Sequence, residues 1–166
     1  MTSPDRPGSL RVGLGTDLHR LEAGLPLILG GVTIPSDFGA RGHSDADVVL
    51  HAVSDALLGA AHGTDIGDLF PDDDPTLAGL DSRRIVAAAL KVAAEHGFRL
   101  VNVDIVVALE RPKLSPHREE LRASLASILG IPANCVGIKA KTSEGLGPVG
   151  RGEAISCQAV ALLEHR

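Results

Sequence analysis

The segment Gly13-Leu14-Gly15-Thr16-Asp17-Leu18-His19 closes an apolar strand that we predict over residues 10–18. Its two glycines predict a close approach of another backbone to the end of this strand. Asp17 and His19 stand two positions apart, so both side chains leave the same face of an extended strand, roughly 6.6 Å from each other. A carboxylate oxygen and an imidazole nitrogen at that separation can both reach one cation through bonds of about 2 Å.

The segment His43-Ser44-Asp45-Ala46-Asp47-Val48-Val49-Leu50-His51 offers a third ligand. It opens a helix that we predict over about residues 45–61. Asp47, His51 and Asp55 follow one another at i, i+4 and i+8, so they form one polar stripe on an otherwise apolar helix. A shared metal would give this stripe its partners. Asp47 and Asp55 lie one turn either side of His51 and are candidates to orient its ring.

Together, Asp17, His19 and His51 form a three-ligand set with a fourth position open, as catalytic zinc requires. The alternative is structural. An Asp-x-His pair is common in strands, and a helix histidine is more often a hydrogen-bonded core residue than a ligand. Spacing alone leaves both interpretations open.

Composition describes an ordinary globular protein. The 166 residues are 44% hydrophobic and 22% charged, which favours one domain over 1–166 with a flexible tail over 1–8. The net charge of −5 and the three aromatic residues, all Phe, argue against nucleic-acid binding. A small phosphorylated substrate remains compatible with this charge if metals and backbone amides reverse its sign locally.

The sequence contains no signal-peptide pattern and no apolar run long enough to span a membrane, so we expect a soluble cytoplasmic protein without a membrane partner. Cys135 and Cys157 lie in different apolar segments without a Cys-x-x-Cys spacing. We expect two free, buried thiols in strands, in a reducing compartment, with a disulfide as the alternative.

Periodicity and turn residues predict an α/β (α+β) fold, a single mixed β-sheet with helices packed on one face. Ser44 or Asp45 is expected to cap the first helix, and Gly97 and Gly130 to end the other two. Strands are predicted over 10–18, 25–29, 32–34, 100–109, 136–141 and 154–163, helices over 45–61, 83–96 and 116–129, and a loop over 35–42.

Three further segments carry polar groups, and each has a simpler explanation. His43 and Ser44 precede a helix, where amides bind anions, although Ser44 could simply be a cap. The acidic stretch 65–74 could bind a hard cation or a polyol, or be a solvated loop. The glycine-rich stretch 139–153 has the amines, hydroxyls and amides that hold a diphosphate with a magnesium-type ion, or is a plain hairpin.

These segments occur in a recognisable order. Asp17-Leu18-His19, His43 to His51, Asp65-Ile66-Gly67 with Leu69-Phe70-Pro71-Asp72, Arg111-Pro112-Lys113, and Lys141 to Gly147 together closely resemble the 2-C-methyl-D-erythritol 2,4-cyclodiphosphate synthase family of the non-mevalonate isoprenoid pathway. Each motif alone is weak, but the ordered set with matching lengths, over about residues 10–163, is specific.

The resemblance implies a role for each matching residue. It implies zinc at Asp17, His19 and His51, and a second divalent ion, Mg²⁺ or Mn²⁺, at Glu144. His43 and Ser44 would contact substrate phosphates. Asp65 and Gly67 would hold the methylerythritol portion, near Phe70 and Asp72. The cytidine and diphosphate pocket would comprise Ala108, Pro112, Lys113, Leu114, Ala140, Lys141 and Thr142, with Lys141 and Thr142 assisting catalysis.

The resemblance also implies a homotrimer with active sites between neighbouring subunits. Arg151, counted among the substrate-binding residues, would lie with Glu153 near the threefold axis. The sequence departs from the family pattern in two ways. Pro148 stands where the family often has Phe. This difference concerns the apolar cavity that the family has at the centre of the trimer. Lys141 and Ser143 interrupt a run that is often Thr, which adds a positive charge beside the diphosphate.

The implied reaction closes a ring within a cytidine diphosphate substrate and releases cytidine monophosphate (CMP). A phosphate nucleophile is already anionic near neutral pH, so no side-chain base is required, and the sequence shows no obvious serine or cysteine nucleophile. Two rivals remain. One is a zinc-dependent phosphodiester hydrolase that activates water with the same ligands, and the other is a metal-stabilised nucleotide-binding module in which His51 is purely structural.

Overall fold

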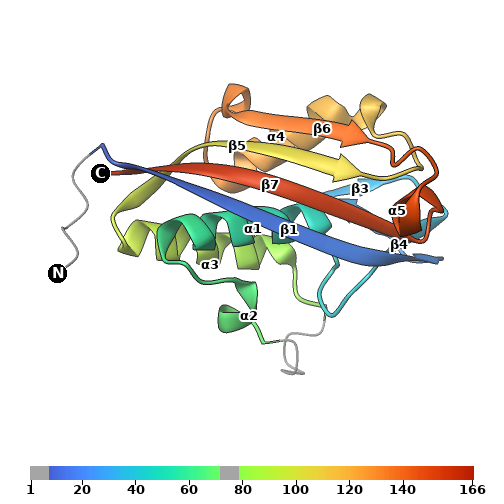
Figure 1. Ribbon diagram of the computed structural model, residues 1–166, viewed down its shortest axis with the longest axis horizontal. Coiled ribbons are helices and arrows are strands. Elements are labelled where there is room, and N and C mark those ends of the chain that lie inside the picture. Colours follow the sequence, from blue (N-terminus) through green and yellow to red (C-terminus); the bar gives the residue numbers. More distant parts are fainter. Residues whose placement is uncertain (1–7, 72–78) are drawn as a thin grey trace.

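The computed structural model describes residues 8–71 and 79–166. Five strands form one sheet in the spatial order β4-β1-β7-β5-β6 (Figure 1). β5 and β6 run parallel, and the other neighbouring strands run antiparallel, so the sheet is mixed as predicted. In this order the strands span Phe38–Arg41, Leu10–Ala23, Ala154–His165, Phe98–Ala108 and Val136–Lys141.

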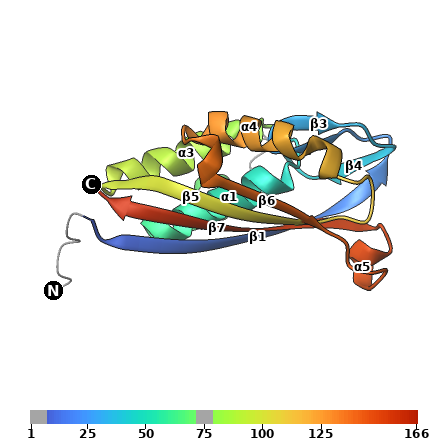
Figure 2. The same cartoon turned by 90° about the horizontal axis from the view of Figure 1, so that it is seen from above.

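Helices α1 (Val48–Ala61), α3 (Ser82–Glu95) and α4 (Arg118–Leu129) lie on one face of this sheet (Figure 2). This arrangement confirms the predicted layers. No helix in the described part of the chain combines the length and the apolar character needed to cross a membrane. The shorter elements are β2 (Leu27–Leu29), β3 (Val32–Ile34), α2 (Ile66–Leu69), η2 (Ser115–His117), η3 (Ala133–Cys135) and α5 (Gly147–Gly150). β2 and β3 pair with each other in a second, two-stranded sheet, so the prediction of a single sheet is wrong in this respect.

Gly13 and Gly15 let α1 lie directly on the backbone of β1. A Cβ atom at Gly13 would stand 1.8 Å from the carbonyl oxygen of Ala56, and one at Gly15 would stand 1.9 Å from that of Ala52. Both distances are far inside van der Waals contact, so any side chain would push the helix off the strand. The predicted close approach is confirmed, and its partner is the helix that carries His51.

Asp47 caps α1 and also ties it to the turn between β2 and β3. Its carboxylate accepts hydrogen bonds from the amides of Val49 and Leu50 in the first helical turn. It also accepts from the amides of Gly30 and Gly31, at 2.9 and 2.7 Å. Burial raises the pKa of Asp47 to about 6, although these amides lower it. One buried carboxylate therefore fixes where α1 begins.

The start of α1 differs from the prediction. The helix begins at Val48 with Asp47 as its N-cap, whereas the sequence predicted a start near residue 45 with Ser44 or Asp45 as the cap. Ala46 has a left-handed φ of 56°, which interrupts helical geometry before Val48. The side chains of Ser44 and Asp45 are thereby available for other contacts.

Other boundaries also differ. β1 continues past Leu18 to Ala23 because it pairs there with β4, which lies within the predicted loop 35–42. The two cysteines are free as predicted, but Cys135 is half-buried in η3 rather than buried in a strand. Residues 1–7 of the predicted tail lie outside the described residues. Gly8 already donates its amide to the carbonyl of His165, at 2.9 Å.

The sheet face opposite the helices, here called the outer face, is apolar along β1. Leu10, Val12, Leu14 and Leu18 point to it and are between 59% and 67% exposed, and Val160 of β7 is 40% exposed beside Leu14. Helices α1, α3 and α4 lie on the other face, and among the described residues only the short helix α5 lies on this side, at one end of the sheet (Figure 2). A contiguous exposed apolar strip of this kind is typical of a protein–protein contact.

We expect Asp47→Ala to lower the free energy of unfolding by about 3 kcal/mol, because it removes a helix cap and leaves the amides of Gly30 and Gly31 without their acceptor. Urea denaturation followed by circular dichroism measures this loss. The matched control is Asp81→Ala, which removes the cap of α3 and an exposed ion pair with Arg83 and should cost about 1 kcal/mol. Equal losses in the two variants would contradict the role given to Asp47.

Candidate active site

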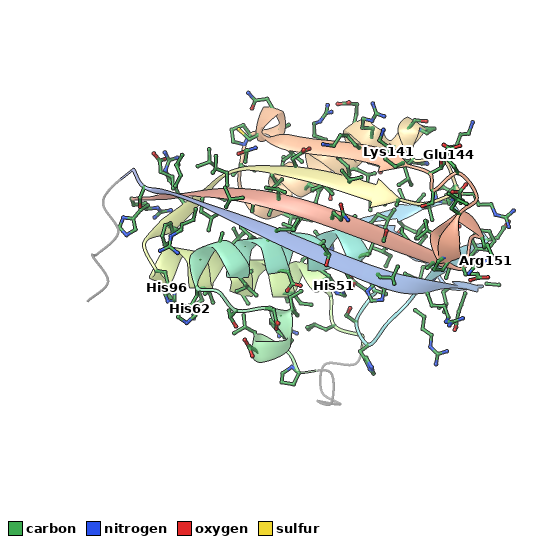
Figure 3. All side chains as sticks on the ribbon, viewed as in Figure 1. His51, His62, His96, Lys141, Glu144 and Arg151 are labelled. Carbon is green, nitrogen blue, oxygen red and sulfur yellow. The ribbon has the colours of Figure 1, made fainter. Side chains whose placement is uncertain are left out.

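Asp17, His19 and His51 converge as their spacing predicts. Oδ2 of Asp17 lies 2.9 Å from both Nε2 of His19 and Nδ1 of His51, and these nitrogens lie 3.2 Å apart. Tetrahedral zinc with bonds of about 2.1 Å separates its ligand atoms by about 3.4 Å. The triangle is therefore about the right size for one such ion. Figure 3 shows His51 where α1 lies against β1.

A backbone contact orients the ring of His19. Its Nδ1 lies 3.0 Å from the carbonyl oxygen of Arg41 in the neighbouring strand β4. A carbonyl can only accept a hydrogen bond, so Nδ1 carries a hydrogen. Nε2 is then the ring nitrogen that can bind a metal, once the proton that it shares with the Asp17 carboxylate is displaced. β4, which the sequence did not predict, thus helps to set the geometry of the site.

The donors also change one another's ionisation. Burial raises the pKa of Asp17, but the hydrogen bonds and charges of His19 and His51 outweigh it and hold this pKa well below its ordinary value. Burial lowers the pKa of His19, but its contact with the Asp17 carboxylate outweighs that effect and the net shift is upward. The Asp17 contact therefore makes the proton of His19 harder for a binding cation to displace.

The three donors line a pocket of about 740 Å³, which is large enough for a phosphorylated small molecule. Four residues assigned to the substrate by resemblance also line it, namely His43, Ser44, Gly67 and Phe70. Its walls therefore combine the candidate metal ligands, polar side chains and apolar groups in one cavity.

Asp65 and Asp72 are also assigned by resemblance to the methylerythritol portion of the substrate. Asp65 caps α2 and accepts the amide hydrogen of Asp68 at 3.3 Å. Asp72 lies outside the described residues. The first residue of α2, Ile66, donates its amide to Oδ1 of Asp55 at 2.9 Å, so α1 anchors α2 beside the pocket.

The structure gives Asp47 and Asp55 a different role from the predicted one. Their carboxylates bind backbone amides rather than the ring of His51. That ring is instead held at Nε2 by the hydroxyl oxygens of Ser44, at 3.0 Å, and Ser82, at 2.9 Å. Ser82 was not predicted, because a serine in the first turn of a helix is an ordinary feature of helix starts.

The second predicted cluster follows β6. Lys141 ends this strand, and the hydroxyl of Thr142 donates to Oε1 of Glu144 at 2.9 Å. β5 and β6 are parallel, so the residues that follow β5 leave the sheet at the same end. Figure 3 shows Lys141 and Glu144 near each other and away from His51. Along these strands and the loop after β5 lie Ala108, Pro112, Lys113, Leu114 and Ala140.

The register separates this cluster from the three metal donors. Asp17, Cys157, Val107 and Ala140 stand side by side across β1, β7, β5 and β6. Three strand spacings span about 14 Å. Lys141 follows Ala140, so its side chain leaves the sheet on the opposite face from that of Asp17. A single chain therefore does not direct both groups onto one ligand.

Arg151 and Glu153 form an exposed ion pair just after α5. Nε and Nη2 of Arg151 donate to the two carboxylate oxygens of Glu153 at 2.9 and 3.0 Å, and this contact lowers the pKa of Glu153. Pro148 lies within α5, whose Val149 is buried. Arg151 lies at the same end of the sheet as Lys141 (Figure 3).

The model of one protein family matches residues 10–164, and the family is described as the YgbB family. The chain belongs to the YgbB family. Curated relatives named 2-C-methyl-D-erythritol 2,4-cyclodiphosphate synthase include one from Dechloromonas aromatica, 54% identical over 95% of this chain and 98% of that protein. Another, from Rhodopirellula baltica, is 50% identical over 100% of this chain and 99% of that protein.

A solved structure supports the same family at the level of the fold. It is a 2C-methyl-D-erythritol-2,4-cyclodiphosphate synthase in a form bound to CDP, and it matches with a TM-score of 0.86 at 44% identity. The match covers 93% of this chain and 100% of the other. The resemblance of this YgbB-family chain to the synthase family, first drawn from its ordered motifs, is confirmed.

Zinc binding should weaken as the pH falls, because zinc needs the neutral imidazole of His19 and the Asp17 contact raises the pKa of that ring. Below this raised pKa, each displaced proton lowers the apparent affinity about tenfold per pH unit. Competition with a chromophoric chelator at several pH values measures the slope. Asp17→Asn should bind zinc more weakly and with a flatter slope. A wild-type slope no steeper than that of Asp17→Asn would contradict this coupling.

Proposed function

We propose that this chain converts 4-diphosphocytidyl-2-C-methyl-D-erythritol 2-phosphate to the 2,4-cyclodiphosphate and releases CMP. The observation that carries the proposal is the triangle of Asp17, His19 and His51 inside a pocket of the right size, in a chain whose curated relatives bear the name of this synthase. The reaction would make the protein a phosphorus–oxygen lyase.

The proposed chemistry is an intramolecular displacement. An oxygen of the 2-phosphate attacks the β phosphorus, and the bond from that phosphorus to the oxygen of CMP breaks. The nucleophile is already an anion, so the protein need not remove a proton. Its task is to bring two anionic groups together in line and to neutralise charge on the leaving oxygen.

Two sets of residues would share this task. Asp17, His19 and His51 would hold zinc, which when bound supplies a Lewis acid and a template for phosphate oxygens. The Glu144 carboxylate suits a hard cation, Mg²⁺ or Mn²⁺, shared with the diphosphate. Lys141 and Thr142 would add charge-assisted hydrogen bonds to the leaving phosphate.

The pocket residues would orient the substrate. Ser44 and His43 line the pocket beside His51 and would contact its phosphates, while Gly67 and Phe70 would contact the methylerythritol portion. Asp65 and Asp72 would complete that part of the site. At the other end of the sheet, the cytidine portion would bind the loop after β5, with the residues Ala108, Pro112, Lys113, Leu114 and Ala140.

We also propose a homotrimer in which each active site combines residues of two subunits. Two observations support it. Lys141 and Asp17 leave opposite faces of the sheet, so one chain cannot direct both at a single diphosphate. The outer face exposes an apolar strip along β1 that a neighbouring subunit would cover. Arg151 would then lie near the threefold axis.

The reaction is tested by incubating the zinc-loaded protein with the cytidyl substrate and Mg²⁺ in ¹⁸O-labelled water. We expect equal amounts of CMP and cyclic diphosphate, without label, because no water enters an intramolecular ring closure. A labelled, open product would instead identify a hydrolase. His51→Ala should keep its circular dichroism spectrum and lose turnover by more than about 100-fold, beyond the usual effect of losing an outer partner of a metal ligand.

The shared site is tested by co-expressing two inactive variants, His51→Ala and Lys141→Ala. In a mixed trimer, some sites would take their metal ligands from a Lys141→Ala chain and Lys141 from a neighbouring His51→Ala chain, and such sites are intact. Each choice has a probability of one half, so random assortment restores about one quarter of the sites. The matched control combines His51→Ala with His19→Ala, which damage the same half and should restore nothing. Activity of the first mixture no higher than that of the control would contradict a site built from two chains.

A further inference from the structure

Ser82 is a fully buried polar residue with no role in the reaction described above. It is the first residue of α3, yet the helix is capped by Asp81, which accepts the amide hydrogen of Arg83 at 2.9 Å. The hydroxyl of Ser82 is therefore not needed as a cap. A hydroxyl buried from water costs free energy unless it has partners, so its contacts should explain its position.

Two side chains satisfy this hydroxyl. Oγ of Ser82 lies 2.9 Å from Nε2 of His51, and it donates a hydrogen bond to Oδ1 of Asp45. The second carboxylate oxygen of Asp45 accepts the backbone amide of Ser82 at 3.2 Å. Asp45 is itself fixed, because its amide donates to the carbonyl of Leu80 at 3.1 Å. A chain of contacts thus runs from Asp45 through Ser82 to His51.

The direction of these hydrogen bonds follows from their chemistry. A carboxylate can only accept, so it takes the single hydroxyl hydrogen of Ser82. Oγ then presents a lone pair to His51, and Nε2 of that ring must carry the hydrogen. The other ring nitrogen, Nδ1, lies beside Asp17 and His19, and in the neutral ring it is the nitrogen that keeps a lone pair for a metal ion. This is the form of imidazole that a metal ion requires.

We propose that Ser82, held by Asp45, is a positioning residue that fixes the ring orientation and tautomer of His51 for the metal. The inference rests on the proposed function only in taking Asp17, His19 and His51 as the metal ligands. It gives His51 a counterpart of the contact between His19 and the Arg41 carbonyl. Both rings are then held at their outer nitrogen by an acceptor.

Ser44 differs from Ser82 although its Oγ is also close to Nε2 of His51, at 3.0 Å. Ser44 accepts the amide hydrogen of Ala46 at 3.1 Å and lines the pocket, so its own hydroxyl hydrogen remains available to a ligand there. The hydrogen of Ser82 is already taken by Asp45. Ser44 therefore faces the ligand, whereas Ser82 holds the ring of His51.

The test measures metal binding directly. We expect Ser82→Ala to weaken zinc about 10- to 100-fold in a chelator competition, the usual effect of losing an outer partner of a metal-bound histidine. The visible spectrum of the cobalt-substituted protein should also change, because the His51 ring is released. Ser82→Thr keeps the hydroxyl and should restore both readouts. The control is Ser54→Ala, another fully buried hydroxyl on α1, bonded to the Leu50 carbonyl at 2.7 Å.

Asp45→Asn provides a second route if Ser82→Ala does not fold. An amide has one acceptor oxygen where the carboxylate uses both, so it cannot accept the amide hydrogen and the hydroxyl hydrogen of Ser82 at the same two positions. It should therefore also weaken zinc and alter the cobalt spectrum. Zinc affinity and cobalt spectra unchanged from wild type in the folded variants would overturn the proposal. An equal loss of zinc in Ser54→Ala would overturn it too, because the effect would then be general loosening.

These results are separable from the proposed function. Wild-type protein that forms the cyclic product, together with Ser82→Ala that binds zinc normally, would overturn the positioning role and leave the reaction standing. Wild-type protein that forms no cyclic product, together with Ser82→Ala and Asp45→Asn that lose zinc, would overturn the reaction and support the positioning role.

Discussion

The contact between the backbones of α1 and β1 is the constraint on which the rest of the site depends. At Gly13 and Gly15 the carbonyl oxygens of Ala56 and Ala52 occupy the space that side chains would fill. Only at this short separation does His51, one residue before Ala52, bring its ring within hydrogen-bond distance of the Asp17 carboxylate. Two residues without any functional group therefore determine whether three ligands can meet.

Asp47 determines where α1 starts along β1. Its carboxylate joins the first turn of α1 to the glycine turn between β2 and β3. His51 lies one turn further along the same helix, so its height above β1 follows from this anchor. Contacts from other elements then orient the two rings, the Arg41 carbonyl for His19 and the hydroxyls of Ser44 and Ser82 for His51.

Local patterns in the sequence predicted much of this arrangement, and long-range contacts account for what they missed. The two-residue spacing of Asp17 and His19, and the i, i+4 positions of Asp47 and His51, follow from strand and helix geometry alone. The pairing that creates β4 and the approach of Ser82 to His51 join residues fifteen or more positions apart. Periodicity cannot report such contacts, and for the same reason Asp47 and Asp55 looked like partners of the ring when they bind amides elsewhere.

The buried thiol of Cys157 in β7 becomes accessible only when the sheet and its helices separate. Its side chain is 1% exposed, in the row that joins Asp17 on β1 to Val107 on β5, and burial raises the pKa of its thiol. Such a sulfur stays protonated and out of reach of alkylating reagents while the helices cover that face. Cys135, half-buried in η3, has no comparable protection. The rate at which Cys157 reacts with an alkylating reagent therefore reports how often the middle of the sheet opens. Cys157 itself has no role in the proposed reaction.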